Sequence, residues 1–255
     1  VLKTRLVKGD APDIISLSAD RSFADFVDAN ILEDLSGKID FSVIDPIYNQ
    51  MLKALEIESV DGIYGVPYAL NASGVIYNKD IFEELGLSIP KTWDEFLGLA
   101  QAVQDNGITP FYFTLKESWT SLPAWNTIAS TLVSSDSFKK VNSKETTFNE
   151  IYSETTDKIM KLMKYGHSDN FGVGYNDGNT AFANGESAMY LQGSYAIPAI
   201  LTVNLAVTTV FLVIVISVVT VFFGVVGFFA VAVVSISALG IERLLCLGGY
   251  IGIRP

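Results

Sequence analysis

Apolar and polar positions follow two different periods along the first 200 residues of the chain. Residues 13–18 (DIISLS) form a short apolar run after a Gly-Asp-Ala-Pro turn, which predicts a buried strand. The next apolar positions have helical spacing and share one face, made of Phe23, Phe26, Val27 and Ile31. Residues 46–55 repeat this spacing and predict a second amphipathic helix.

The same two periods continue through the middle of the chain. Residues 61–80 alternate like a pair of strands, and residues 81–85 predict a short helix. Thr92 and Glu95 have the spacing of a capping box, in which Glu95 reaches back to the backbone of Thr92 at the start of a helix.

Strands and helices keep alternating up to residue 200. Residues 109–115 predict a strand, residues 124–133 a helix and residues 149–165 a longer helix. Residues 178–196 pass from a helix through a turn and a strand into another helix. This alternation predicts an α/β fold with a mostly parallel sheet.

The pattern changes abruptly at the end of this region. Residues 199–241, about 43 in number, contain no charged residue, no histidine and no proline. A single bilayer crossing needs only about 20 residues, whereas one helix of this length would span about 65 Å. We expect either two membrane spans, turning near Gly224 and Gly227, or one tilted span with an interfacial piece. Length favours two spans, while Arg243 and Arg254 favour a cytoplasmic C-terminus and an odd number.

Charge excludes one class of partner. The 255-residue chain has a net charge of −11, and its last 55 residues contain only Glu242, Arg243 and Arg254 as charged residues. The first 200 residues therefore carry 27 acidic against 15 basic side chains. Because a nucleic-acid-binding surface needs an excess of Lys and Arg, we expect no nucleic-acid partner.

The sequence also contains no motif that indicates a bound cofactor or metal ion. The single cysteine, Cys246, lies in the apolar tail, and the single histidine, His167, follows a predicted helix end, where a cation is ordinary. The chain has no glycine-rich phosphate loop and no H-E-x-x-H motif. We therefore expect no cofactor, no metal and no catalytic triad.

Polar and aromatic residues gather where predicted strands end. The candidates are Asp20, Arg21, Tyr68, Asn71, Glu117, Trp119 and Tyr195, with Trp125 as a further candidate that is equally suited to a helix core. Ligands of open α/β sheets bind beyond the carboxyl ends of strands. Aromatic faces stack on the C–H faces of sugars, and charged side chains bind hydroxyls. A paired-carboxylate alternative, in which Asp20 and Glu117 cleave a glycosidic bond, is also open.

Four ordered stretches carry a family resemblance. They are GDAPDIISLSADR, GVPYALNASGVIYNKDIFEELGLSIPKTWDEFLGLAQAV, TPFYFTLKESWTSLPAW and AFANGESAMYLQGSYA. Together they cover nearly all of residues 1–200, and the chain resembles the extracellular solute-binding proteins of carbohydrate ABC transporters, of the maltose-binding type.

The resemblance implies a periplasmic-binding-protein fold of type II, with two α/β lobes that close on a sugar or oligosaccharide and present it to the permease subunits outside the cytoplasm. Residues 1–72 then belong to lobe 1, residues 73–78 to the hinge crossing and residues 79–200 to lobe 2, with residues 201–255 as a transmembrane-like tail.

Individual residues match the binding positions of this family. Asp20 and Arg21 resemble the polar pair of lobe 1 that holds sugar hydroxyls, and Asn71 falls where maltose-type proteins have a carboxylate. Glu117 and Trp119 resemble the acidic and aromatic pair of lobe 2. Tyr195 stands where the family most often has tryptophan, which keeps a smaller stacking face.

The chain also departs from the family at both ends. We expect it to begin inside a domain, because the family's opening strand and helix do not precede Val1, and the apolar tail stands where the second half of the family should start. Three origins of the tail are open: a genuine membrane anchor, the start of a fused permease, or a frameshift or assembly join. Its position inside a domain favours a truncated or chimeric product. A membrane-anchored sensor that reuses the binding fold is the alternative function.

Overall fold

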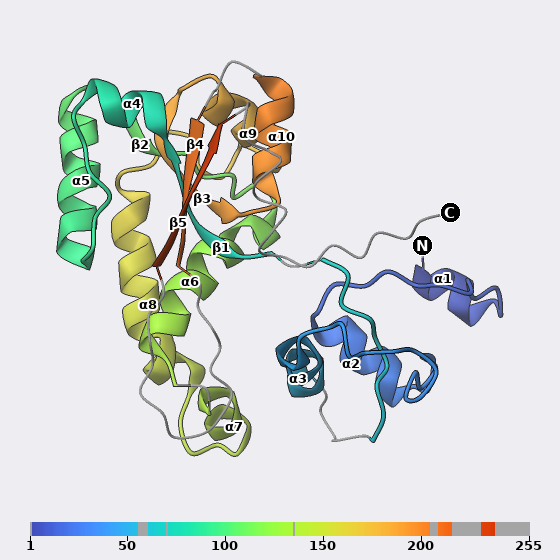
Figure 1. The fold of residues 1–255 in the computed structure, drawn as a ribbon. Coiled ribbons are helices and arrows are strands. Elements are labelled where there is room, and N and C mark those ends of the chain that lie inside the picture. The colour runs from blue at the N-terminus through green and yellow to red at the C-terminus, as the bar shows by residue number, and fades with distance from the viewer. Residues whose placement is uncertain are drawn as a thin grey trace. The chain divides into compact units, whose positions relative to one another are not determined.

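The structure, a computed structural model, describes residues 2–55, 61–69, 71–134, 136–204, 209–215 and 231–237 (Figure 1). The chain divides into two compact units, which we name unit 1 (Val1–Leu70) and unit 2 (Asn71–Pro255). Unit 1 contains α1 (Leu2–Val7), α2 (Arg21–Asp28) and α3 (Pro46–Leu55).

Unit 1 is built around the apolar face of α2. Asp20 is the N-cap of this helix, and its carboxylate accepts a hydrogen bond from the backbone N–H of Ser22 at 2.8 Å. Phe23, Phe26 and Val27 are buried, as the helical spacing predicts. The two helices expected in this unit are thus confirmed, although α2 ends at Asp28 and leaves Ile31 outside it.

The strands expected in unit 1 are wrong. Residues 13–18 form neither helix nor strand, and Ile14 is 89 % exposed. Residues 61–69 likewise form no strand. An apolar run becomes a strand only where a neighbouring strand satisfies its backbone groups, and the described residues of unit 1 include no strand.

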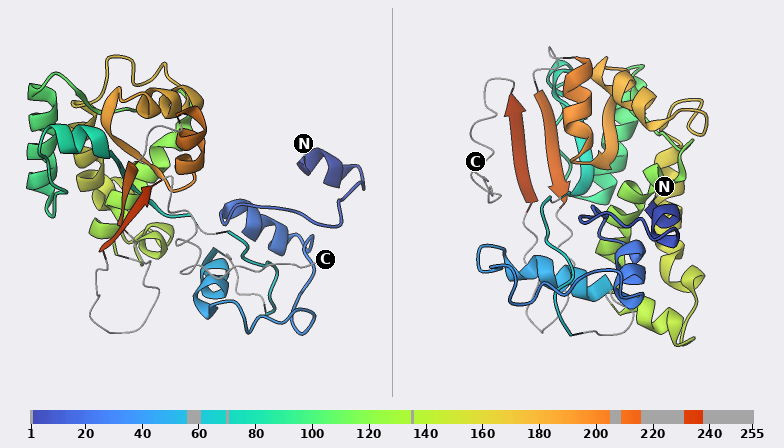
Figure 2. Two further views of the ribbon diagram at one scale, coloured as in Figure 1. Left: turned by 45° about the horizontal axis from the view of Figure 1, so that its top comes forward. Right: turned by 90° about the vertical axis from the view of Figure 1, so that its right-hand side faces the viewer.

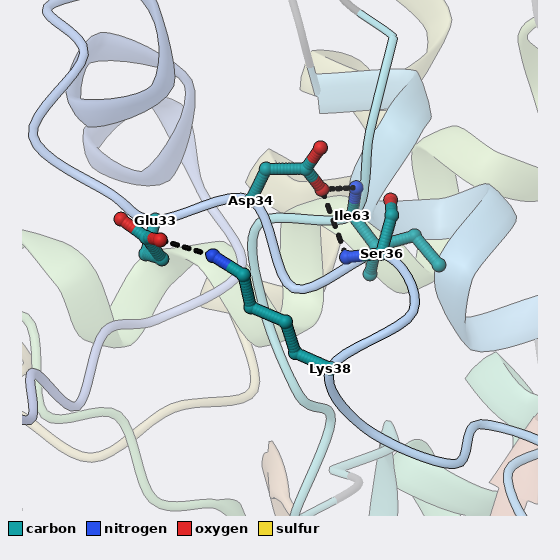
Figure 3. A network of polar contacts seen from close by, with 5 residues as sticks. All are labelled: Glu33, Asp34, Ser36, Lys38 and Ile63. Atoms are coloured by element: carbon teal, nitrogen blue, oxygen red, sulfur yellow. Dashed lines mark hydrogen bonds and ion pairs between the residues drawn. The ribbon is translucent and has the colours of Figure 1, made fainter.

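A polar network joins two loops of unit 1 (Figure 3). The Asp34 carboxylate accepts hydrogen bonds from the backbone N–H groups of Ser36 at 2.9 Å and Ile63 at 3.1 Å. Glu33 and Lys38 form an ion pair beside it. Hydrogen bonds from Ser36 and from the Ile63 backbone lower the pKa of Asp34 to about 2, because they stabilise the ionised carboxylate.

Unit 2 is a mixed sheet with helices on both faces. Its strands are β1 (Ser73–Asn78), β2 (Thr109–Phe111), β3 (Ser187–Gly193), β4 (Thr209–Val215) and β5 (Val231–Ser237). Its helices are α4 (Lys79–Glu84), α5 (Trp93–Asp105), the 3-10 helix η1 (Ser118–Ser121), α6 (Leu122–Leu132), α7 (Ser137–Asn142), α8 (Phe148–Met163), α9 (Tyr175–Ala183) and α10 (Ala196–Val203). The described strands have the order β2-β3-β1-β4-β5, with β4 and β5 side by side (Figure 2).

Alternate residues of β1 and β3 build two separate cores. Val75 and Tyr77 of β1 share one core with Met189 and Leu191 of β3, and this core includes buried residues of α4, α5, α6 and α8. Ile76 and Tyr190 point to the opposite face, where α9 and α10 cover the sheet (Figure 1). The period of two thus places apolar residues on both faces, and the strands are almost continuously hydrophobic.

Two details of unit 2 differ from expectation. Among the described strands only β2 and β3 are parallel, so the sheet is mixed rather than mostly parallel. Strand direction depends on which distant segments pair, and β1 pairs with β3 more than a hundred residues later. Thr92 caps α5 through the Glu95 N–H, but Glu95 reaches back to the backbone N–H of Lys91, at 2.6 Å, instead of that of Thr92.

The described part of the apolar tail corrects the expectation of membrane-spanning helices there. Residues 209–215 and 231–237 are antiparallel strands, and β4 pairs with β1. Both segments are rich in β-branched Val and Ile, which favour strands where a partner edge is present. Within the described ranges, no helix has the length and apolarity that a bilayer crossing requires. Gly224, Gly227, Cys246 and the two C-terminal arginines lie outside these ranges.

Acid is expected to break the Asp34 contacts only near pH 2. Folding lowers the pKa of Asp34 from 3.8 to about 2, so the ionised carboxylate stabilises unit 1 above about pH 4, and this contribution is lost as the pH falls toward 2. In a ¹⁵N-NMR titration, the amide resonances of Ser36 and Ile63 should therefore share a midpoint near 2. Asp34→Asn should abolish this titration, whereas a midpoint near 3.8 in the unchanged protein would contradict the two hydrogen bonds.

Candidate ligand-binding site

Four side chains of unit 2 form one cluster beyond the carboxyl ends of two adjacent strands. Glu117 and Trp119 follow β2, Tyr195 follows β3, and Tyr175 begins α9. Since β2 and β3 are parallel neighbours, the loops that follow them emerge at the same edge of the sheet. We call Glu117, Trp119, Tyr175 and Tyr195 the unit 2 cluster.

The Glu117 carboxylate is held at the start of α9. Its Oε2 accepts a hydrogen bond from the backbone N–H of Tyr175 at 2.9 Å, where helix N-termini favour negative charge. Gly174 permits this approach, because a Cβ at that position would lie 3.1 Å from Glu117 Oε1. The Thr120 hydroxyl donates to the carbonyls of Thr114 and Glu117, which fixes the turn that carries Glu117.

The three aromatic rings of the unit 2 cluster contact one another at an angle. Ring centroids lie 5.0 Å apart for Trp119 and Tyr175, 6.1 Å for Trp119 and Tyr195, and 6.2 Å for Tyr175 and Tyr195. The interplanar angles are 56°, 53° and 52°, respectively. Trp119 remains 42 % exposed. Such a cluster combines partly exposed aromatic surface with a neighbouring carboxylate, which suits a ligand that has both C–H faces and hydroxyls.

Tyr195 turns its hydroxyl inward. The hydroxyl donates a hydrogen bond to Oε1 of the fully buried Gln192 at 3.0 Å. Partial burial, aided by the neighbouring Tyr175, raises the pKa of Tyr195. The tyrosine is therefore a neutral aromatic surface whose polar end is already paired.

The candidates in unit 1 make local contacts there. Asp20 caps α2, and the Arg21 guanidinium forms an ion pair with Asp25 at 2.7 Å. Tyr68 is 77 % exposed, and its hydroxyl forms a hydrogen bond with the Ser16 hydroxyl at 2.7 Å. These groups lie on exposed loops and a helix start, and their role in ligand binding stays a prediction.

Trp125 lies in a different aromatic group from the unit 2 cluster. Its ring centroid is 6.3 Å from that of Phe148 and 6.0 Å from that of Tyr152, so it packs between α6 and α8. Asn71 is exposed, two residues before β1. The structure thus brings together Glu117, Trp119 and Tyr195 and leaves Trp125 apart from them. Asn71 precedes Ala72, whose carbonyl accepts the backbone N–H of Ser194 beside Tyr195, and its role in ligand binding stays a prediction.

Sequence reasoning missed Tyr175. This tyrosine follows the glycine-rich stretch FGVGYNDG, which contains no phosphate-loop motif. A glycine before an aromatic residue at a helix start is a weak signal by itself. The contact with Glu117 depends on segments 58 residues apart, so only the fold reveals it.

His167 has hydrogen-bond partners at both ring nitrogens. Nε2 lies 2.8 Å from the carbonyl oxygen of Phe113, and Nδ1 accepts the backbone N–H of Asp169 at 3.2 Å. This arrangement fits a neutral ring that donates from Nε2. Across the described residues, no group of three His, Cys, Asp or Glu side chains is placed to hold a metal ion.

The chain belongs to the bacterial extracellular solute-binding protein family, which it matches over residues 1–212. It is 34 % identical over 212 residues to the multiple sugar-binding protein of Streptococcus mutans, covering 78 % of this chain and 49 % of that protein. The family resemblance of the four motifs is thereby confirmed. Members of this family are extracytoplasmic binding proteins rather than enzymes, which disfavours the glycosidase alternative.

Solved structures support the predicted α/β class. The solute-binding protein RafE in complex with raffinose is 32 % identical and has a TM-score of 0.64, covering 79 % of this chain and 54 % of that one. A chitin oligosaccharide binding protein is 26 % identical with a TM-score of 0.62, covering 78 % and 50 %. The chain thus spans about half the length of the relatives that it matches.

Removing the Glu117 carboxylate is expected to loosen the first turn of α9. Glu117→Ala deletes the acceptor for the Tyr175 N–H, so exchange of the Tyr175 amide proton should accelerate about tenfold, as for the loss of one charge-assisted hydrogen bond. Glu117→Gln retains an acceptor oxygen and should show a smaller increase.

The control for this exchange measurement is Glu84→Ala, which removes an exposed carboxylate at the end of α4. It should leave the Tyr175 amide unchanged. Equal exchange rates at Tyr175 in Glu117→Ala and the unchanged protein would contradict the capping role of Glu117.

Proposed function

We propose that this chain is part of the sugar-binding component of an ABC importer, and that it binds a sugar or oligosaccharide between its two lobes. The observation that carries the proposal is the unit 2 cluster, in a member of the extracellular solute-binding family. An open indole, two tyrosine rings and a carboxylate are the groups that recognise a carbohydrate in water.

Each lobe has its own role in this proposal. Trp119 and Tyr195 of unit 2 stack on sugar rings, and Tyr175 flanks them. Asp20, Arg21 and Tyr68 of unit 1 bind sugar hydroxyls, as does Asn71 at the start of unit 2. A carboxylate or guanidinium pairs with two hydroxyls at once, so these groups add orientation to the apolar stacking.

The transport step follows from ligand-dependent closure. The motifs predict the hinge crossing at residues 73–78, which form β1 near the start of unit 2, and we propose that closure turns about the chain at this point. A ligand that contacts both lobes stabilises the closed arrangement over the open one, and the permease binds the closed form. The membrane-anchored sensor is less favoured, because the matching family and the relatives' names indicate solute and sugar binding.

The names of related proteins suggest the ligand class. One relative is a multiple sugar-binding protein, one solved structure contains raffinose, and another is a chitin oligosaccharide binding protein. These ligands have several linked pyranose or furanose rings, each with an apolar C–H face. We therefore favour a short oligosaccharide and choose raffinose as the first probe.

Titration of the full chain with raffinose, maltose and chitobiose should give saturable heat in a calorimeter for at least one sugar. Trp119→Ala removes the most exposed ring of the unit 2 cluster and should weaken that binding about tenfold, because a sugar–aromatic stacking contact is lost. Trp125→Ala tests whether Trp125 also contacts the ligand.

The matched control is Phe171→Ala, which removes a 67 % exposed aromatic ring outside the unit 2 cluster. It should bind sugar as the unchanged protein does. No binding to any sugar would contradict the proposal, and tight binding to a peptide or an amino acid would indicate another class of ligand.

A further inference from the structure

The ring of Tyr195 lies directly over the backbone of Gly193. A Cβ at Gly193 would lie 2.1 Å from Cε1 of this ring and 2.7 Å from both Cδ1 and Cζ. These distances are far below any allowed contact, so the ring occupies the space where a side chain would stand. Gly193 is not among the residues with a positive φ, so it is the ring and not the backbone that requires glycine here.

Gln192 holds the other end of the same ring. Its side chain is 1 % exposed, and its Oε1 accepts the hydrogen bond from the Tyr195 hydroxyl. Strand alternation places Gln192 on the face of the sheet that α9 and α10 cover, beside Tyr190. The hydroxyl is therefore anchored inside the protein, while the ring lies against the backbone.

Two independent contacts thus fix one aromatic ring. Trp119 and Tyr175 touch it only at tilted angles and at centroid distances above 6 Å, which constrains its rotation weakly. The hydrogen bond from the Tyr195 hydroxyl to Gln192 and the free space above Gly193 determine where the ring lies. Fixing a side chain before binding avoids the entropy loss of ordering it on the ligand.

We propose that Gln192 and Gly193 are positioning residues that hold the Tyr195 ring as a preformed stacking face for the sugar. The proposal rests on the proposed function and deepens it. Because the hydroxyl donates its proton to Gln192, Tyr195 has no hydroxyl proton left for the ligand and recognises it through its ring face. At this position the site takes a saccharide ring that presents an apolar C–H face.

Gly193→Ala probes the ring position with little disturbance elsewhere. The added methyl group collides with the ring and displaces it, while the backbone angles of residue 193 suit alanine. Gly98→Ala is the matched control, because nothing lies within 4 Å of a Cβ at that position. Gln192→Met removes the hydrogen-bond acceptor and keeps the length of the side chain.

The ring position is measured without any ligand. In the full chain with ¹³C-labelled tyrosine rings, the Tyr195 resonances, assigned with Tyr195→Phe, are shifted by the ring currents of Trp119 and Tyr175. We expect them to move in Gly193→Ala and in Gln192→Met, and to stay in place in Gly98→Ala. Unchanged Tyr195 resonances in both site variants would overturn the proposal.

Raffinose binding then tests the consequence for recognition. Gly193→Ala and Gln192→Met should each weaken binding about tenfold, and Gly98→Ala should not change it. In a double-mutant cycle, Tyr195→Phe with Gln192→Met should lose no more affinity than the weaker-binding single variant, because both remove the same bond.

Two outcomes distinguish a failure of this positioning role from a failure of the proposed sugar-binding function. A displaced ring with unchanged raffinose affinity, or additive losses in the cycle, would overturn the positioning role while sugar binding stands. If the unchanged protein binds no sugar at all, the proposed function fails and the role of the ring in recognition fails with it.

Discussion

Unit 2 depends on strand β3, which lies between β2 and β1 and is buried along all seven residues. Its parallel pairing with β2 brings the ends of both strands to one edge, where Glu117, Trp119 and Tyr195 meet. Its antiparallel pairing with β1 connects this edge to the segment where unit 2 begins. Its alternating side chains also separate the two cores that hold the helices.

Local signals in the sequence predicted the helices well, and for physical reasons. The spacing of Phe23, Phe26 and Val27 defines a buried face whatever lies opposite, and Thr92 caps its helix through contacts three residues apart. Strands depend on partners instead. Residues 13–18 have the composition of a strand but form none in the structure, and the antiparallel direction of β1 comes from a pairing that spacing alone does not encode.

The candidate site shows the same division between local and long-range information. Residues that follow β2 and β3 were brought together as the rule of strand ends predicts. Trp125 lies in α6 and packs with Phe148 and Tyr152, because the face of α6 that carries it contacts α8. Tyr175 belongs to the cluster because its backbone N–H donates to Glu117, and no sequence motif predicts this contact. The expectation of membrane-spanning helices was wrong for residues 209–215 and 231–237, because their Val and Ile residues suit a membrane helix and a β-strand equally.

The central claim is that a sugar binds at the unit 2 cluster, and the three tryptophan indole N–H resonances of the full chain test it most directly. During a raffinose titration, the Trp119 resonance should shift in a saturable way. The Trp93 resonance should stay in place, because that ring packs against the core on α5 beneath the Lys158 ammonium. A shift of Trp93 with no change at Trp119, or no change in any indole at saturating sugar, would contradict the account.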